Sequence, residues 1–276
     1  MLKITPRNRK HNIELELFVV DAFTTERFKG NSAAVVPVTH WLSDAQMLAI
    51  AQENNLSETA FIKRLAANHY AIRWFSPLTE IDFCGHATLA SAYVLFNHFA
   101  CDAPLNFETA AVGTLSVTQT ADKRITMRFP NRAPQRVDDI PAPLLAGLSI
   151  TPDEVWLSPQ AYFAVYHDEQ AVLEVLRDNE QLKQLAPYDV VATAQSSDYD
   201  FISRYFWPAN GGDEDPVTGS IHAGLAPFWG ERLGKTELVA YQASHRGGVL
   251  QCDWQGEHVM VSGHGVLYLH GTIQVD

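Results

Sequence analysis

One pattern of residue types occurs once in each half of the chain. An aromatic, strand-like segment is followed by a proline turn, a polar loop, a glycine with a polar neighbour, and then an apolar run long enough for a helix. An ancient duplication is the simplest explanation. It predicts two similar domains that face each other, with the matching loops meeting at one cleft and each bringing the N-terminus of a helix. The first copy comprises residues 74–77, 84–86 and 87–99, and the second comprises residues 205–208, 215–220 and 221–229.

Both apolar runs are expected to form buried helices. Residues 87–99 contain no Asp, Glu, Lys or Arg, and a helix that is apolar on nearly all sides is usually buried. Small residues in both runs let neighbouring backbone approach closely, and Pro227 is expected to bend the second helix. The surrounding strand patterns are short and look mostly antiparallel. Together these features favour an α+β fold in which a curled sheet wraps around a central helix, twice.

Local signals place the other elements. Residues 1–12 are a polar tail, and Ser43 with Gln46 forms a capping box that predicts a helix over residues 44–54. Residues 130–143 are marked by prolines and are the best candidate for a linker.

Composition and charge exclude several classes of protein but do not identify a function. Apolar residues make up 46% and charged residues 19% of the 276 residues, which is typical of a globular protein. A net charge of −12 without a basic run argues against nucleic-acid binding. No apolar stretch approaches the length of a membrane span. Because no targeting segment is recognisable and the three cysteines are odd in number and lack metal spacing, we expect a reduced, cytoplasmic protein without a metal.

Glu58 is the first candidate for chemistry. It lies between a helix end and an apolar strand, where partial loss of solvent raises the pKa of a carboxyl group toward the range of a general acid or base. The alternative is a glutamate that caps or pairs locally.

The two glycines of the repeated pattern form the second candidate. Gly85-His86 and Gly219-Ser220 each precede an apolar run, and the free N–H groups of a helix start bind anions. Two such starts at one cleft would hold a carboxylate and stabilise negative charge in a transition state. The alternative is a pair of ordinary helix caps, although their matching flanks argue against it.

Asp215 is the third candidate. Pro216 favours an extended Asp215, which could orient His86 or a substrate amine, or could simply be solvated. Thr218 stands where the first copy has Cys84, so the chain is not expected to use a pair of thiols. His222 is expected to be a packed or capping histidine.

Five ordered motifs carry a resemblance to a known family. Together they resemble the phenazine-biosynthesis isomerase (PhzF-like) family, from about residue 17 to the C-terminus. The five motifs are residues 20–24, 28–35, 56–61, 83–88 and 214–220.

The resemblance implies a diaminopimelate-epimerase-like fold with the active site between two pseudo-symmetric domains. It also implies a homodimer. The type member of the family isomerises trans-2,3-dihydro-3-hydroxyanthranilate without cofactor or metal, so the resemblance implies a reaction of this kind. The glutamate of the family's Ser-Glu-Thr motif corresponds to Glu58, and the other family positions to His86, Asp215, Gly219 and Ser220. The implied domains are residues 13–129, with a returning strand near 265–275, and residues 130–264.

We therefore predict a cofactor-independent isomerase of a small carboxylated metabolite. Two alternatives remain open: a one-base epimerase of an amino-acid-like substrate, and a non-catalytic protein that binds a small acid. Residues 242–247 depart from the family pattern and are expected to shape the substrate pocket. The predicted catalytic residues are Glu58, His86 and Asp215, and the predicted substrate-binding residues are Asn31, Gly85, Thr218, Gly219 and Ser220.

Overall fold

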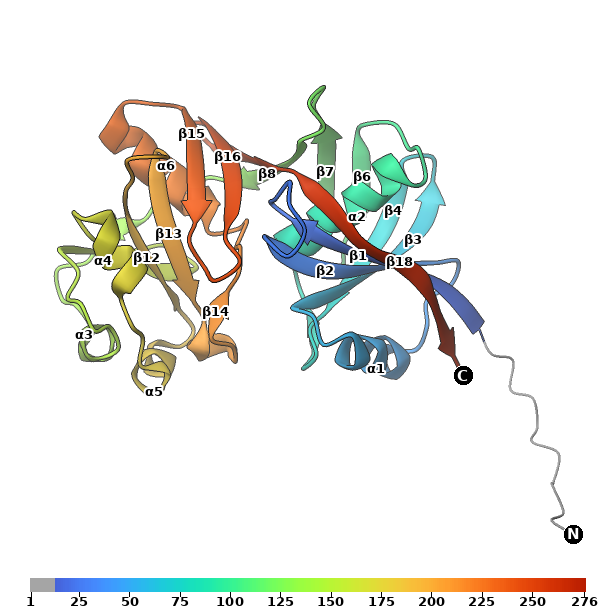
Figure 1. Cartoon of the computed structure of the whole chain (residues 1–276), viewed down its shortest axis with the longest axis horizontal. Helices are drawn as coiled ribbons and strands as arrows, with labels where there is room; N and C mark the ends of the chain where they lie inside the picture. Colours follow the sequence, from blue (N-terminus) through green and yellow to red (C-terminus); the bar gives the residue numbers. More distant parts are fainter. Residues whose placement is uncertain (1–12) are drawn as a thin grey trace, which may run out of the picture.

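The computed structural model describes residues 13–276, and the predicted tail at residues 1–12 lies outside them. Within the described residues, the strands join into one continuous network of eighteen. The network has two halves of matching topology, seen as the two lobes of Figure 1.

The first half contains eight strands and two helices. Helix α1 begins with the predicted capping box, in which the Ser43 hydroxyl accepts a hydrogen bond from the Gln46 backbone N–H (3.3 Å), and it is followed by a left-handed Asn55. The elements are β1 (Ile13–Ala22), β2 (Asn31–Val38), α1 (Asp44–Asn54), β3 (Glu58–Ala66), β4 (His69–Phe75), β5 (Glu80–Ile81), α2 (Gly85–Asn97), β6 (Leu105–Glu108), β7 (Thr114–Gln119) and β8 (Ile125–Pro130).

The second half repeats this plan around one long helix, with small helices added on its outer side. The sequence patterns did not predict these small helices, which bury Leu144, Val172 and Leu182 in a separate core against β12 and β13. The main elements are β10 (Glu154–Leu157), β11 (Ala161–Val165), β12 (Asp189–Gln195), β13 (Phe201–Phe206), β14 (Glu214–Asp215), α6 (His222–Leu233), β15 (Glu237–Gln242), β16 (Gly248–Gln255) and β17 (His258–Gly263). The small helices are α3 (Ala142–Ala146), α4 (Glu169–Glu174), α5 (Asn179–Leu182), η1 (Lys183–Leu185) and η2 (Pro208–Asn210).

The two halves pair their strands in the same order and sense. The pairs β1–β2 and β3–β4 are antiparallel, whereas β2–β3 and β4–β6 are parallel. In the second half, β10–β11 and β12–β13 are antiparallel, whereas β11–β12 and β13–β15 are parallel. The antiparallel run β6–β7–β8 corresponds to β15–β16–β17. This repetition confirms the predicted α+β fold of two pseudo-symmetric, mainly antiparallel domains.

Strands cross between the halves at two matching places. β8 and β17 pair with each other, and the chain beyond each of them passes to the opposite half. β18 (Gly265–Val275) pairs with β1 and is the dark red strand that runs between the lobes in Figure 1, while β9 (Gln135–Arg136) pairs with β10. Residues 130–143 are therefore more than a linker, since they contain β9 and the first two residues of α3. The domain limits near residues 129 and 264 stay a prediction.

The central helices α2 and α6 are buried as expected. In α2 the buried hydroxyls of Thr88 and Ser91 donate to the backbone oxygens of Cys84 (2.6 Å) and Ala87 (2.7 Å), so no polar group of these side chains is left unsatisfied. In α6 a methyl group added at Gly224 would lie 2.8 Å from the Arg132 backbone oxygen. Close backbone approach therefore requires a glycine at position 224.

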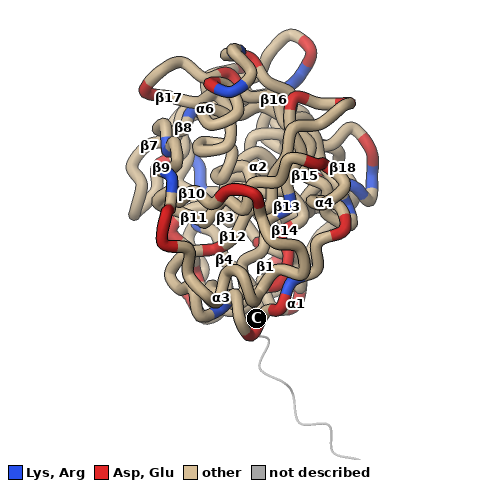
Figure 2. The backbone as a smooth tube through the Cα atoms, turned by 90° about the vertical axis from the view of Figure 1, so that its left-hand side faces the viewer, with Lys and Arg blue, Asp and Glu red and all other residues tan. Residues whose placement is uncertain are grey.

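Along the backbone seen in Figure 2, Lys and Arg lie in short, separated segments, with Asp and Glu spread among them. In residues 13–276, no helix is both long enough and apolar enough to cross a membrane.

Candidate functional site

The starts of the two central helices meet. A methyl group built on Gly85, the first residue of α2, would lie 3.9 Å from the Cα atom of Gly219. Gly219 and Ser220 do not open α6 themselves, because α6 begins at His222. They form a turn directly before it, in which their backbone oxygens accept hydrogen bonds from His222 and Ala223 (3.2 and 3.1 Å). The predicted convergence of the two matching loops is therefore observed, with the second glycine one turn ahead of its helix.

A small cavity of about 130 Å³ lies at this meeting point, and we call it the Glu58 pocket. Seven of the eight predicted site residues line it: Glu58, Gly85, His86, Asp215, Thr218, Gly219 and Ser220. Seven further residues complete the lining: Ser57, Ile81, Phe83, Cys84, Asp189, Tyr205 and Trp207.

Glu58 is the first residue of β3, which lies beside β2 in the parallel register Ala33–Glu58. Its side chain is 11% exposed, and its Oε2 atom lies 2.9 Å from Nε2 of His86. Despite this contact, Oε2 accepts no well-aligned hydrogen bond from residues 13–276. A buried carboxylate oxygen beside a cation, with free lone pairs, is suited to accept a proton from a bound molecule.

The pKa of His86 is set by two opposing effects. Burial alone would lower the pKa of this imidazole, but contacts with Cys84 and Glu58 outweigh burial and raise it well above its usual value. Its Nδ1 atom lies 3.4 Å from the Cys84 sulfur and 3.2 Å from Nδ2 of Asn31.

Asp215 is fixed by residues of both halves. The amide of Asn31, from β2, donates to its Oδ1 atom (2.7 Å), and the Thr218 hydroxyl donates to its Oδ2 atom (2.5 Å). Burial raises the pKa of the Asp215 carboxyl group, although His86 and these two hydrogen bonds oppose the shift. No direct hydrogen bond joins Asp215 to His86 among the described residues, so Asn31 is the link between them.

Asn31 lies behind the wall of the Glu58 pocket, and its role in substrate binding stays a prediction. Its side chain is fully buried and is not part of the pocket wall. Besides Asp215, its amide donates to the Val217 backbone oxygen (3.0 Å), and its Oδ1 accepts from the Ser57 hydroxyl (3.2 Å). Asn31 therefore ties the loop of the second half to the first half from behind the site.

Residues 242–247, which we expected to shape the substrate pocket, also lie behind the site and are not part of the pocket wall. The fully buried Gln242 accepts from the Thr218 N–H (2.8 Å) and donates to the Asp215 backbone oxygen (2.9 Å). Arg246 reaches the first half, where it donates to Asp21 (2.8 Å) and to the Gly30 backbone oxygen (2.7 Å). This segment holds the site loop and joins the halves.

Asp189 was missed from the sequence. It is the first residue of β12 and pairs with Ala161 of β11, as Glu58 pairs with Ala33, so the duplication relates Asp189 to Glu58. Its Oδ2 atom accepts from the Tyr205 hydroxyl (2.6 Å) and its Oδ1 atom from Asn210 (2.8 Å). Tracing the repeated aromatic segment back by one strand would have found it.

A chain of hydrogen bonds connects Asp189 to the second helix start. The Gln160 amide donates to the Tyr205 hydroxyl (2.9 Å) and to the Ser220 hydroxyl (3.0 Å). Burial raises the pKa of the Asp189 carboxyl group, against the opposing effect of the hydrogen bonds from Tyr205 and Asn210. The wall contributed by the second half is thereby fixed in position.

His222 is a packed histidine, as expected. It is fully buried at the start of α6, and its Nδ1 lies 2.8 Å from the Thr218 backbone oxygen. Its Nε2 atom has no partner among the described residues, and burial lowers its pKa to about 4. The neutral ring therefore donates from Nδ1 and supports the loop that carries Thr218.

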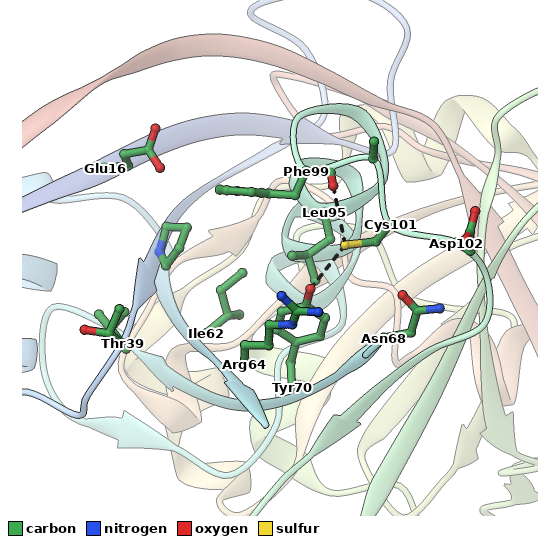
Figure 3. Close-up of a pocket in the computed structure, with 13 residues that line it drawn as sticks. Glu16, Thr39, Ile62, Arg64, Asn68, Tyr70, Leu95, Phe99, Cys101 and Asp102 are labelled. Atoms are coloured by element: carbon green, nitrogen blue, oxygen red, sulfur yellow. Dashed lines mark hydrogen bonds between the residues drawn. The ribbon is translucent and has the colours of Figure 1, made fainter. Parts of the chain in front are cut away.

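A larger cavity of about 520 Å³ lies elsewhere, on the first half (Figure 3). There the Tyr70 hydroxyl lies 3.1 Å from the Cys101 sulfur, and burial together with this contact raises the pKa of Tyr70 to about 12. Its lining includes Glu16 and Arg64 but none of the predicted site residues. We prefer the smaller Glu58 pocket, because it combines two helix starts, a buried histidine and carboxylates in one cavity.

These features define a protein of the diaminopimelate-epimerase-like fold with a pocket of acid–base groups where its helix starts meet. The family described as phenazine biosynthesis-like protein matches residues 20–271. An uncharacterized isomerase of Pseudomonas aeruginosa is 46% identical over 264 residues, covering 95% of this chain and 100% of that protein. The chain belongs to the phenazine biosynthesis-like family.

Solved structures agree with this assignment. A phenazine biosynthesis protein of the PhzF family from Enterococcus faecalis has a TM-score of 0.90 at 42% identity, covering 95% of this chain and 99% of that one. A protein from P. aeruginosa described as a predicted epimerase has a TM-score of 0.68 at 19% identity, covering 94% and 99% of the two chains, and shares the fold.

Proposed function

We propose that this chain is a cofactor-independent isomerase that moves a proton between carbons of a small carboxylated metabolite. The observation that carries the proposal is the Oε2 atom of Glu58, which is buried in the Glu58 pocket, lies 2.9 Å from His86 and accepts no aligned hydrogen bond from the described residues.

Glu58 is the proposed general base and then the general acid. As a carboxylate it removes a proton from a carbon next to an unsaturated or carboxylate-bearing group, and the electron pair spreads into the substrate. Protonated Glu58 then returns the proton at another carbon, so that no net proton is gained or lost. Nε2 of His86 lies 2.9 Å from the Oε2 atom of Glu58 and holds the carboxyl group in position.

Backbone N–H groups stabilise the negative charge that develops on the substrate. The first N–H groups of a helix have no partner within the helix, and Gly85 and His86 provide two of them at the start of α2. The turn at Gly219 and Ser220 faces them across the pocket. A carboxylate of the substrate fits between these two sets of donors.

The contacts of Asp189 favour one base rather than two. Both of its carboxylate oxygens already accept hydrogen bonds, whereas Oε2 of Glu58 does not. A single base is compatible with the isomerase and also with a one-base epimerase of an amino-acid-like substrate. We further propose a cytoplasmic homodimer, which light scattering and cell fractionation would test.

Proton NMR in D2O with trans-2,3-dihydro-3-hydroxyanthranilate is the experiment that tests the proposal. Isomerisation with carbon-bound deuterium is the expected result. Deuterium at a stereocentre with loss of optical purity, observed with amino-acid-like carboxylates, would establish the epimerase instead. Thermal stabilisation by small acids without exchange at any carbon would identify a binding protein and overturn the enzyme proposal.

A further inference from the structure

A cavity of about 370 Å³ opens where β7 and β8 separate, and we call it the Arg128 cavity. The two strands pair with each other only near their connecting turn, from Gln119–Ile125 to Val117–Met127. Beyond this point β7 remains paired with β6, and β8 remains paired with β17. Residues 114–117 of one strand and 127–130 of the other therefore form opposite walls of the cavity.

The charged side chains of this cavity are all basic. Its lining includes Arg128, Arg132 and His258 but no Asp or Glu, in a chain with a net charge of −12. The larger cavity of Figure 3 differs, because its one arginine, Arg64, shares the wall with two acids, Glu16 and Asp102. A concave surface with charges of one sign attracts ligands of the opposite sign. The Arg128 cavity is therefore suited to an anion.

Arg128 and Arg132 also differ from the other arginines in their contacts. Neither makes an ion pair or a side-chain hydrogen bond within residues 13–276, whereas every other arginine of this range makes at least one. Both are exposed, so their side chains can turn toward a ligand. A guanidinium group binds a carboxylate or a phosphate through two parallel hydrogen bonds. Two such groups without partners thus line the same cavity.

The deeper wall of the Arg128 cavity is apolar. Val117, Met127 and Phe129 are buried side chains of this wall, whereas the two arginines lie on its exposed side. An apolar wall gains free energy when a ligand displaces water from it, and a few charged groups then fix the orientation of that ligand. The combination fits a small acid with an apolar body.

Phe83 connects the Arg128 cavity to the Glu58 pocket, because its side chain lines both. Its ring packs edge to face on Phe129, with the ring centroids 5.7 Å apart. A methyl group added at Gly85 would lie 3.6 Å from the Phe129 ring and 3.9 Å from the Phe83 ring. These two aromatic rings therefore stand between the Arg128 cavity and the start of α2.

We propose that the Arg128 cavity binds the carboxylate or phosphate group of a small acid with an apolar body. Arg128 and Arg132 bind the anionic group, and Phe83, Met127 and Phe129 contact the body. The acid group belongs either to a separate molecule or to the far end of a substrate whose reacting carbons lie beside Glu58. The second source rests on the proposed function, whereas the binding itself does not.

Calorimetry of the full-length protein with phenyl phosphate tests the binding. This probe joins an apolar ring to a phosphate group, and inorganic phosphate and phenol each keep only one of these parts. We expect one phenyl phosphate per chain, bound at least tenfold more tightly than either control, and weaker binding at higher salt. Equal affinity for phenol would show that the arginines do not bind the anion, and would overturn the proposal.

Variants assign the binding to the two arginines. The double variant Arg128→Gln with Arg132→Gln should bind phenyl phosphate at least tenfold more weakly than the wild type. Arg136→Gln is the matched control, because Arg136 is an exposed arginine of the same region but lies outside the cavity. It removes one positive charge and should change the affinity less than twofold. Equal affinities of the double variant and the control would refute the assignment.

Methyl NMR of methionines labelled with ¹³C tests where the probe binds. The Met127 signal, assigned with Met127→Leu, should shift on saturation with phenyl phosphate, because Met127 lines the cavity. The Met47 signal should stay in place, because Met47 lies in a separate core with Val36 and Phe61. Saturable binding that leaves the Met127 signal unchanged would place the probe elsewhere and overturn the proposal.

Carbon-bound deuterium exchange distinguishes the two sources of the acid group. If the cavity holds the far end of the substrate, phenyl phosphate raises KM for exchange and leaves kcat unchanged. If the cavity holds a separate acid, the substrate reacts with phenyl phosphate bound, and KM is not raised. Absence of exchange with every acid tested would overturn the isomerase proposal, whereas the calorimetry and methyl NMR results would still decide the binding.

Discussion

The buried histidine His222 gives the clearest prediction for stability. Its ring is neutral, donates from Nδ1 to the Thr218 oxygen and has no partner for a second proton among the described residues. Burial lowers its pKa from 6.5 to about 4 in the folded state. The unfolded chain therefore binds a proton more tightly than the folded protein between these values, and the folded state loses stability as the pH falls through this range.

The magnitude follows from the size of this shift. Between pH 7 and pH 4.5, a single group that titrates near 6.5 unfolded and near 4 folded reduces the free energy of unfolding by about 2.5 kcal/mol. Urea unfolding followed by tryptophan fluorescence, at both pH values, measures this loss in the wild type and in His222→Gln. We expect the wild type to lose about 2.5 kcal/mol more than the variant over this interval.

His40→Gln is the control, because His40 is an exposed histidine on the surface of the first half. It is expected to lose as much stability as the wild type over the same interval. An equal loss in His222→Gln and the wild type would refute the reasoning, whatever the absolute stability of the variant.

Three further substitutions test the framework of the site. Asn31→Ala removes the donor to Asp215 and Val217 and should lower the free energy of unfolding by about 3 kcal/mol. The exposed control Asn97→Ala should lower it by less than about 0.5 kcal/mol. A small effect in both variants would contradict the bridging role of Asn31. Arg246→Met leaves the buried Asp21 without its cation and should lower the free energy of unfolding by about 3 kcal/mol. A change near zero would show that this ion pair does not hold the halves together. Gly85→Ala adds a methyl group no closer than 3.6 Å to its neighbours, so the free energy of unfolding should change by less than about 1 kcal/mol. The rate of carbon-bound exchange should nevertheless fall at least tenfold. An unchanged exchange rate would place the substrate elsewhere.

The sequence predicts the local elements well because they depend on short-range signals. The capping box of Ser43 and Gln46 forms as expected, and the two apolar runs become the buried helices α2 and α6. The repeated aromatic segment and its glycine predict that two helix starts meet, and the short separation of Gly85 and Gly219 agrees.

The features that the sequence does not predict all involve contacts between distant segments. The hydrogen bonds of Asn31 to Asp215 and Val217 span the two halves and place its side chain behind the pocket wall, so its role in substrate binding stays a prediction. Residues 242–247 support the loop at Thr218 from outside the pocket for the same reason. Asp189 lies in no motif like the Ser-Glu-Thr around Glu58, so only a strand-by-strand comparison of the two copies marks it as the counterpart of Glu58.

The central claim is that the Glu58 carboxylate carries the substrate proton. Proton NMR in D2O tests it most directly, by comparing carbon-bound exchange in the wild type, Glu58→Gln and the exposed-carboxylate control Glu53→Gln, with folding checked by urea unfolding. We expect Glu53→Gln to match the wild type and Glu58→Gln to lose about 10²–10⁴-fold in rate while remaining folded. Exchange at a near-normal rate in folded Glu58→Gln would contradict the account.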